Sequence, residues 1–213
     1  MTGMARALGR QLLHPTGFGG RLTGAVMDMA NRKPTRLALD LLAPGPHERV
    51  LDAGCGTGAA AEQLLHRSTC QIDCVDWSPT MLRRAEARLG HYRKPPHLHH
   101  VTLHLGQVGA LPFIAGQFDA VLALNMLYFC DSQGVMVGDL RRMLRPGGRL
   151  IAYVTHRAAM GRWAFTRHGT HRLFDEEELV SALMEGGFAR EQIVTMPCSI
   201  TRSIHGILVR ATV

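Results

Sequence analysis

The sequence predicts an α/β fold in which helices cover both faces of a mostly parallel sheet. Short apolar segments alternate with amphipathic helical segments along most of the chain, an order typical of parallel sheets. The last two apolar segments, near 191–196 and 204–211, are joined by a short connection. They must pair antiparallel, because a parallel crossover needs about a dozen residues or more. We therefore expect a Rossmann-like three-layer sandwich with a seven-stranded sheet whose last strand is antiparallel.

The individual elements follow from hydrophobic periodicity and from their terminal residues. Ser78 before Pro79 is a strong helix start, and Asp175 with Glu178 forms a predicted capping box. The segment 146–148, Pro-Gly-Gly, is expected to end a helix. Helices are expected near 20–43, 57–67, 78–89, 134–148 and 174–188, and strands near 49–54, 71–76, 100–105, 118–127, 149–154, 191–196 and 204–211.

The chain length of 213 residues suits one domain, 1–213. Within it we expect residues 1–47 to form a helical cap over the active site. Residues 155–173 are expected to form a basic lid, because this stretch is rich in arginine and, up to residue 172, free of acids. The sequence shows neither a membrane-spanning apolar run nor a secretory signal, so we expect a cytoplasmic protein without a membrane span.

The formal net charge is +7, which is compatible with a nucleic-acid partner, an anionic substrate or simply a basic surface. The chain has five cysteines, an odd number, and no C-x-x-C pair. We expect reduced thiols and no metal site. The histidine-rich run 91–104 lacks a carboxylate or cysteine partner and is interpreted as structural.

The segment RVLDAGCGTGAAAEQLL (49–65) joins a strand to a helix through a glycine-rich loop. Gly54, Gly56 and Ala59 fit the pattern G-x-G-x-x-G/A, and Asp76 ends the next strand. A carboxylate at that place accepts hydrogen bonds from a ribose. Both features suit any adenosine cofactor, a dinucleotide included.

Asp52, beside the loop, favours a cationic cofactor over a dinucleotide. Its carboxylate would repel a pyrophosphate and attract an ammonium or sulfonium group. The short dehydrogenases need a tyrosine followed four residues later by a lysine, and none of Tyr92, Tyr128 and Tyr153 has one. The antiparallel last strand is also unusual for dinucleotide enzymes.

Five segments within about 48–190 resemble, in order, the motifs of the class I S-adenosylmethionine-dependent methyltransferases, and specifically a small-molecule branch similar to methyltransferase type 11. The segments are VLDAGCGTG (50–58), VDWSPTML (75–82), GQVGALPF (106–113), FDAVLALNMLYF (118–129) and LRRMLRPGGRLI (140–151). The resemblance implies S-adenosyl-L-methionine as cofactor and S-adenosyl-L-homocysteine as product.

The resemblance also implies cofactor-binding roles. The residues that would surround the methionine portion are Gly54, Cys55, Gly56, Gly58 and Asn125, with Asp52 near the amino group. Asp76 would hold the ribose hydroxyls, Trp77 would lie against the adenine, and Val108 would meet the adenine through its backbone. Gln107 stands where the family commonly has an aspartate that accepts from the adenine amino group, and its amide oxygen remains an acceptor.

The predicted reaction is methyl transfer to a small-molecule acceptor by in-line displacement, driven mainly by proximity and desolvation. His156 and Tyr128 are the candidate catalytic residues, each at the end of a strand that faces the pocket. The sequence NMLY (125–128) lacks the D/N-P-P motif of nucleic-acid amino methyltransferases, which favours a small-molecule acceptor. The arginine-rich stretch 155–172, with Trp163 and Phe165, would suit a planar or anionic substrate. A nucleic-acid methyltransferase and an inactive cofactor-binding partner subunit remain the alternatives. We expect a monomer or homodimer.

Overall fold

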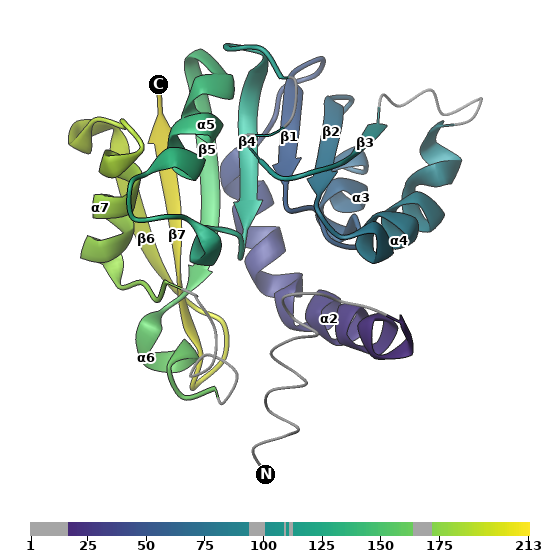
Figure 1. Ribbon diagram of the computed structural model, residues 1–213, viewed down its shortest axis with the longest axis horizontal. Coiled ribbons are helices and arrows are strands. Elements are labelled where there is room, and N and C mark those ends of the chain that lie inside the picture. The colour runs from purple at the N-terminus through teal and green to yellow at the C-terminus, as the bar shows by residue number, and fades with distance from the viewer. Residues whose placement is uncertain (1–16, 94–100, 109, 111–112, 164–171) are drawn as a thin grey trace.

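The computed structural model describes residues 17–93, 101–108, 110, 113–163 and 172–213, with only the backbone of 17–27 and 93. Its seven strands form one sheet in the order β3-β2-β1-β4-β5-β7-β6 (Figure 1). The strands are β1 (Arg49–Ala53), β2 (Gln71–Asp76), β3 (Val101–Leu105), β4 (Phe118–Leu124), β5 (Leu144–Thr155), β6 (Ile193–Ser199) and β7 (His205–Thr212). β7 runs antiparallel to both β5 and β6, whereas β1 to β5 pair in parallel. The predicted fold class is confirmed.

Helices cover both faces of the sheet, which gives three layers (Figure 1). The helices are α2 (Gly17–Leu42), α3 (Ala59–Leu65), α4 (Pro79–Leu89), α5 (Val135–Met143), α6 (Arg157–Met160) and α7 (Glu176–Glu185), with short 3-10 turns at η1 (Gly90–Arg93), η2 (Leu127–Phe129) and η4 (Arg190–Gln192). The apolar sides of α2, α3 and α4 share one core cluster, and those of α5 and α7 share the other. None of the described helices combines the length and apolarity of a membrane-spanning segment.

Local sequence signals explain where several helices begin. The Ser78 hydroxyl accepts a hydrogen bond from the backbone N–H of Met81, and Pro79 occupies the first helical position of α4. The carboxylate of Asp175 accepts from the backbone N–H of Glu178, whose own carboxylate accepts in return. Both predicted helix starts are confirmed. All five cysteines are free, as expected.

The prediction that a helix extends to the Pro-Gly-Gly segment 146–148 is wrong. α5 ends at Met143, and β5 begins at Leu144, which pairs with Phe118. The register then shifts, and the excess residues form an irregularity between the two strands. Gly147 turns with a φ of 76° and donates its N–H to the carbonyl of Val213 at 2.7 Å. Glycine and proline here shape a bulged strand rather than a loop between helix and strand.

The reversal of strand order at β1 positions the functional site. From β1 the sheet grows to one side through β2 and to the other through β4, so the helices that follow β1 and β4 leave a crevice at the strands' carboxyl ends. β4 stops at Leu124, three residues earlier than expected, because Asn125 turns away with a φ of 55°. The chain after β4 therefore bends across the mouth of this crevice.

Candidate functional site

A cavity of about 200 Å³ lies at the carboxyl ends of β1, β2 and β4. Four parts of the chain supply its walls. They are the middle of α2, residues within Asp52–Gln63, residues within Asp76–Met81, and residues within Leu124–Phe129. α2 contributes Asp28, Asn31 and Thr35. The cavity thus combines the glycine loop predicted as a cofactor site with the helix predicted as a cap.

Asp52 is the electrostatic centre of this cavity. Its side chain is buried, and its Oδ2 has no hydrogen-bond partner among the described residues. Burial, together with the smaller effect of the nearby Asp76 carboxylate, raises the pKa of this carboxyl to about 7. A buried carboxylate with an unused oxygen is costly unless a cation or donor reaches it. The wall at Asp52 therefore fits a cationic ligand group.

Asp76 is held in place by the backbone on both sides of the cavity. Its Oδ2 accepts from the N–H of Gly56 at 2.9 Å, and its Oδ1 accepts from the N–H of Ser78 at 2.8 Å. Burial raises its pKa, whereas these two hydrogen bonds lower it. A carboxylate oxygen accepts more than one hydrogen bond, so both oxygens retain capacity for ligand hydroxyls. The adjacent Trp77 ring also lines the cavity.

The glycines of the loop have different roles. Gly54 and Gly56 have φ values of 74° and 56° and line the cavity, so the backbone approaches the ligand space without side chains. Gly58 does not line it. A Cβ at Gly58 would lie 2.9 Å from Leu89 Cδ1, so this glycine allows α4 to pack against the loop.

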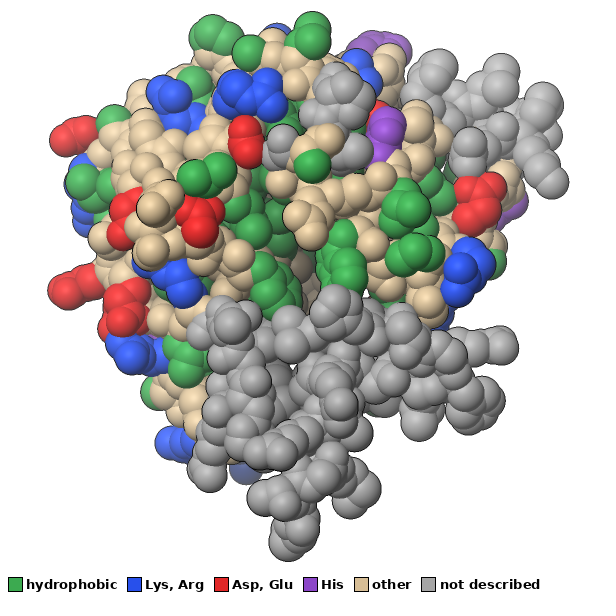
Figure 2. Space-filling model, in the orientation of Figure 1, with side chains coloured by type: hydrophobic (Ala, Val, Ile, Leu, Met, Phe, Trp, Pro, Cys, Tyr) green, Lys and Arg blue, Asp and Glu red, His purple; other side chains and the backbone are tan. Residues whose placement is uncertain are grey.

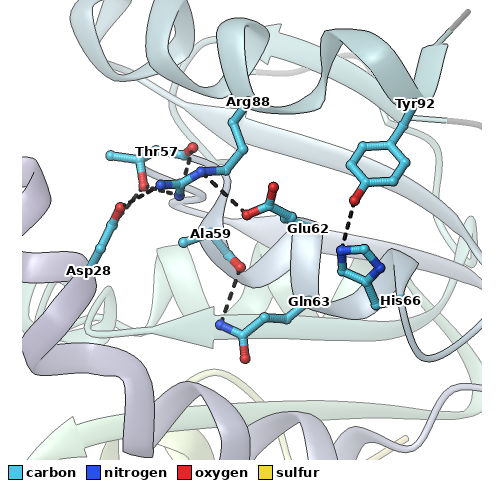
Figure 3. Close-up of polar contacts among 8 residues, drawn as sticks. All are labelled: Asp28, Thr57, Ala59, Glu62, Gln63, His66, Arg88 and Tyr92. Atoms are coloured by element: carbon cyan, nitrogen blue, oxygen red, sulfur yellow. Dashed lines mark hydrogen bonds and ion pairs between the residues drawn. The ribbon is translucent and has the colours of Figure 1, made fainter.

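Thr57, within the glycine loop, is held by two charged side chains from different helices (Figure 3). Its hydroxyl donates to Asp28 Oδ1 at 2.7 Å and accepts from Arg88 Nη1 at 2.8 Å. Arg88 also pairs with Asp28 at 2.9 Å and with Glu62 at 3.5 Å. The loop, α2, α3 and α4 are therefore tied together at one point.

A chain of hydrogen bonds fixes Asn125 at the opposite wall. The Tyr128 hydroxyl accepts from the backbone N–H of Thr155 at 2.5 Å and donates to Asn125 Oδ1 at 3.0 Å. The Nδ2 of Asn125 in turn donates to Asn31 Oδ1 at 3.0 Å. Burial is the main cause that raises the pKa of Tyr128 far above its ordinary value. Tyr128 thus orients Asn125 and is not among the residues that line the cavity.

His156 caps α6 and is not among the cavity residues. Its Nδ1 accepts from the backbone N–H of Ala158 at 3.1 Å, and its Nε2 lies 3.8 Å from a carboxylate oxygen of Glu176. The lone pair of Nδ1 is therefore engaged in helix capping. The structure brings neither predicted catalytic group to the wall of the cavity.

Comparison with known proteins identifies the family. Residues 51–152 match the family model of the methyltransferase domain. The malonyl-[acyl-carrier protein] O-methyltransferase of Enterobacter lignolyticus (strain SCF1) is 35% identical over 172 residues, which cover 75% of this chain and 64% of that protein. Residues 51–152 are therefore assigned to the methyltransferase-domain family, in agreement with the class I S-adenosylmethionine-dependent motifs in the sequence. The chain spans less than two thirds of the length of that relative.

Solved structures share the fold of this chain. The [4+2]-cyclase SpnF has a TM-score of 0.69 at 19% identity, covering 84% of this chain and 80% of its own. The 1,6-didemethyltoxoflavin-N1-methyltransferase of Burkholderia thailandensis, with its substrate and S-adenosylhomocysteine bound, has a TM-score of 0.64 at 21% identity, covering 86% and 77%. A cyclase and a methyltransferase therefore share this architecture, which fixes the fold but not the reaction.

Two predicted adenine contacts, Gln107 and Val108, are not among the cavity residues. Gln107 is exposed and Val108 packs partly against the core. They border residues 109 and 111–112, which lie outside the described residues. Parts of three other predicted segments also lie outside the described residues. These parts are 164–171 of the predicted lid, 1–16 of the predicted cap and 94–100 of the histidine-rich run. Within the described part of the chain, no three His, Cys, Asp or Glu side chains lie close enough together to hold a metal ion.

The sequence analysis missed several walls of the cavity. Thr35, Gln63 and Met81 line it from three different helices. Gln63 follows Ala59 by one helical turn, so its helical spacing was visible in the sequence. The sequence predicted a helical cap over the site but not which residues of α2 line the cavity. No motif marks the face of this helix that meets the glycine loop.

Proposed function

We propose that this protein transfers a methyl group from S-adenosyl-L-methionine to a small-molecule acceptor. The observation that carries the proposal is the unpartnered, buried Oδ2 of Asp52 in the wall of the cavity beside the glycine loop. The α-ammonium group of this cofactor supplies the positive charge and the donors that such an oxygen requires. A dinucleotide pyrophosphate would bring negative charge to the same place.

The other walls match the remaining parts of the cofactor. Asp76 accepts hydrogen bonds from the ribose hydroxyls with the lone pairs that Gly56 and Ser78 leave unused. Trp77, with 40% of its surface exposed, offers a ring face to the adenine. Asn125, fixed by Tyr128, faces the methionine portion. When bound, the cofactor supplies an electrophilic methyl group on a sulfonium.

Positioning and exclusion of water account for the catalysis we propose. An in-line displacement at a sulfonium methyl needs no protonated leaving group, so alignment of the acceptor supplies most of the rate. Neither Tyr128 nor His156 presents a free basic atom to the cavity, since both are engaged in hydrogen bonds to the backbone. We therefore assign both to positioning.

The relatives support a small-molecule acceptor over nucleic acid. One similar protein is named for methylation of malonyl-[acyl-carrier protein], and another was solved with 1,6-didemethyltoxoflavin. Their acceptors differ in size and in the atom methylated, so the acceptor of this chain is assigned only as a small molecule. The cytoplasmic location and the monomeric or homodimeric state stay predictions.

Calorimetric titration with S-adenosylmethionine and S-adenosylhomocysteine tests this function. Asp76→Ala is expected to weaken binding by about tenfold or more, because two charge-assisted hydrogen bonds to the ribose are lost. Asp139→Asn, which alters a half-buried carboxylate on α5 outside the cavity, is the matched control. Absence of binding to the unaltered protein, or equal affinity in Asp76→Ala, would overturn the proposal.

Transfer of radiolabel from the cofactor to a panel of metabolites then identifies the acceptor. Label in a small molecule supports the proposal, whereas label in RNA supports the nucleic-acid alternative. Tight cofactor binding with no transfer to any metabolite or RNA supports the inactive partner subunit.

A further inference from the structure

A second, larger cavity of about 850 Å³ adjoins the cofactor cavity on the side of α2, α3 and α4. The two cavities share Asp28, Ala59 and Gln63 as wall residues, so they meet along the first turns of α3. We call the second one the basic cleft, after the six cationic side chains that line it. These are Arg32, Lys33, Arg36, Arg67, Arg84 and Arg88.

The basic cleft concentrates positive charge. Against its six cations stand two acids, Asp28 and Glu62, which leaves a formal charge of +4 out of +7 for the whole chain. Both acids pair with Arg88, at 2.9 and 3.5 Å. On the face shown in Figure 2, by contrast, acidic side chains gather toward α7, whose first turn carries three glutamates. The cleft therefore carries more than half of the formal net charge of the chain.

Helical spacing places the cations in opposing pairs. Arg32 and Arg36 lie one turn apart on α2, and Arg84 and Arg88 lie one turn apart on α4. Residues of α3 lie between them in the wall of the cleft. A ligand in the cleft is therefore approached by guanidinium groups from two helices.

Two of these guanidinium groups are available for a ligand. Arg32 and Arg36 are exposed, and neither side chain forms a hydrogen bond or ion pair with any described residue. Lys33 reaches only the carbonyl of Ile200, at 3.5 Å. In the described part of the predicted lid, Arg157 is paired with Glu178 and Arg172 with Glu185, which leaves Arg162. The cleft, by contrast, supplies two unpaired arginines one turn apart on a single helix.

We propose that the basic cleft binds a phosphate-bearing group of the methyl acceptor. Gathering like charges in a concave surface is unfavourable unless an anion offsets them. Five of the six cations are arginines, whose planar guanidinium groups match phosphate oxygens in pairs. The cofactor carries no phosphate, so the cleft serves another ligand. Its junction with the cofactor cavity allows one acceptor to place its nucleophile beside the cofactor and its phosphate in the cleft. This inference rests on the proposed function.

Titration with inorganic pyrophosphate, with and without saturating S-adenosylhomocysteine, tests the inference. Arg32→Gln/Arg36→Gln is expected to weaken pyrophosphate binding by about tenfold or more, because two charged hydrogen-bond donors are removed. The control, Arg190→Gln/Arg210→Gln, removes two exposed charges next to or on strands β6 and β7, outside the cleft. It is expected to change affinity by less than about twofold. S-adenosylhomocysteine affinity is expected to be unchanged in both variants.

The outcomes separate this inference from the function on which it rests. Simultaneous binding of pyrophosphate and S-adenosylhomocysteine, lost selectively in the α2 variant, supports a phosphate subsite for the acceptor. Competition between the two ligands overturns it, because the cleft would then belong to the cofactor site. Equal loss in both double variants also overturns it and indicates unspecific charge attraction. Failure of pyrophosphate binding with intact S-adenosylhomocysteine binding removes the subsite and leaves the proposed function standing.

A short RNA provides the competing arm. RNA binding that falls steeply with salt and is lost in Arg32→Gln/Arg36→Gln, while pyrophosphate does not bind, would assign the cleft to nucleic acid and overturn the inference.

Discussion

The guanidinium of Arg88 and the carboxylate of Asp28 enclose the hydroxyl of Thr57 and meet each other at 2.9 Å (Figure 3). Asp28 and Thr57 line the cofactor cavity, whereas Arg88 does not. Arg88 acts on the cavity only through these partners. It is a positioning residue that holds the glycine loop against α2.

Arg88→Lys is expected to weaken S-adenosylhomocysteine binding several-fold. Lysine keeps the charge but cannot contact Asp28, Thr57 and Glu62 together, because it lacks the planar fork of a guanidinium. Calorimetry measures the affinity, and Arg83→Lys on the exposed side of the same helix is the control. Asp28→Asn combined with Arg88→Lys should be less harmful than the sum of the single effects, since both break the same contact. Additive losses would show that the pair does not act as a unit.

Asp52 gives cofactor binding a specific pH dependence. Its pKa of about 7 means that below neutral pH the carboxyl is protonated and must lose its proton before it attracts an ammonium group. Affinity for S-adenosylhomocysteine should therefore fall by up to about tenfold per pH unit below 7. Titrations from about pH 5.5 to 7.5, below the range where an α-amino group deprotonates, measure this slope. Asp52→Asn should bind weakly and without the slope, and a slope that persists would assign it to another group.

The same carboxyl lowers stability at alkaline pH. Its pKa in the fold lies above its ordinary value of 3.8, so the folded protein binds more protons than the unfolded chain between about pH 4 and 7. The free energy of unfolding due to this group therefore falls as pH rises through that window and stays low above it. Asp52→Asn should raise the melting temperature at pH 8 and change it little at pH 4. If Asp52→Asn raised the melting temperature equally at pH 4 and pH 8, the ionisation of Asp52 would not be the cause of the stabilisation.

Sequence patterns predicted the sheet and the glycine loop well, because both depend on local and periodic signals. The short final connection sufficed to predict that β6 and β7 pair antiparallel, but not that β7 lies between β5 and β6. In the structure Asp52 and Asp76 line one cavity, because the carboxyl ends of neighbouring parallel strands meet. The prediction that a helix extends to the Pro-Gly-Gly segment 146–148 was wrong, because glycine and proline are common both at helix ends and in β-bulges.

Side-chain partners between distant elements were beyond the sequence. Neither Arg88 nor Asp28 belongs to a sequence motif that predicts its partner. Their meeting at Thr57 depends on how α2 crosses the loop, which is a property of tertiary packing. For His156, too, the sequence did not reveal a contact made in the fold. Its place after a core strand suggests a catalytic base, yet capping of α6 engages its Nδ1.

Substitution of His156 distinguishes a capping role from a catalytic one. Asparagine is a good N-cap residue and cannot act as a base near neutral pH, whereas alanine cannot do either. His156→Asn should keep the stability and, with an identified acceptor, most of the kcat. His156→Ala should lose about 1 kcal/mol of stability. A fall in kcat of about a hundredfold or more in the asparagine variant would restore the role of general base.

Tyr128→Phe tests whether the hydroxyl positions Asn125. Its removal leaves the buried N–H of Thr155 without its acceptor and frees the Asn125 amide, so the variant should lose about 1–3 kcal/mol of stability and bind S-adenosylhomocysteine several-fold more weakly. Tyr92→Phe is the matched control, because its hydroxyl bonds His66 at 2.8 Å outside the cavity. It should lose stability without losing affinity.

Since burial holds the pKa of Tyr128 far above neutral, the pH profile of methyl transfer should keep its shape between pH 6 and 9 in Tyr128→Phe. A limb of that profile that disappears with the hydroxyl would instead identify Tyr128 as the base.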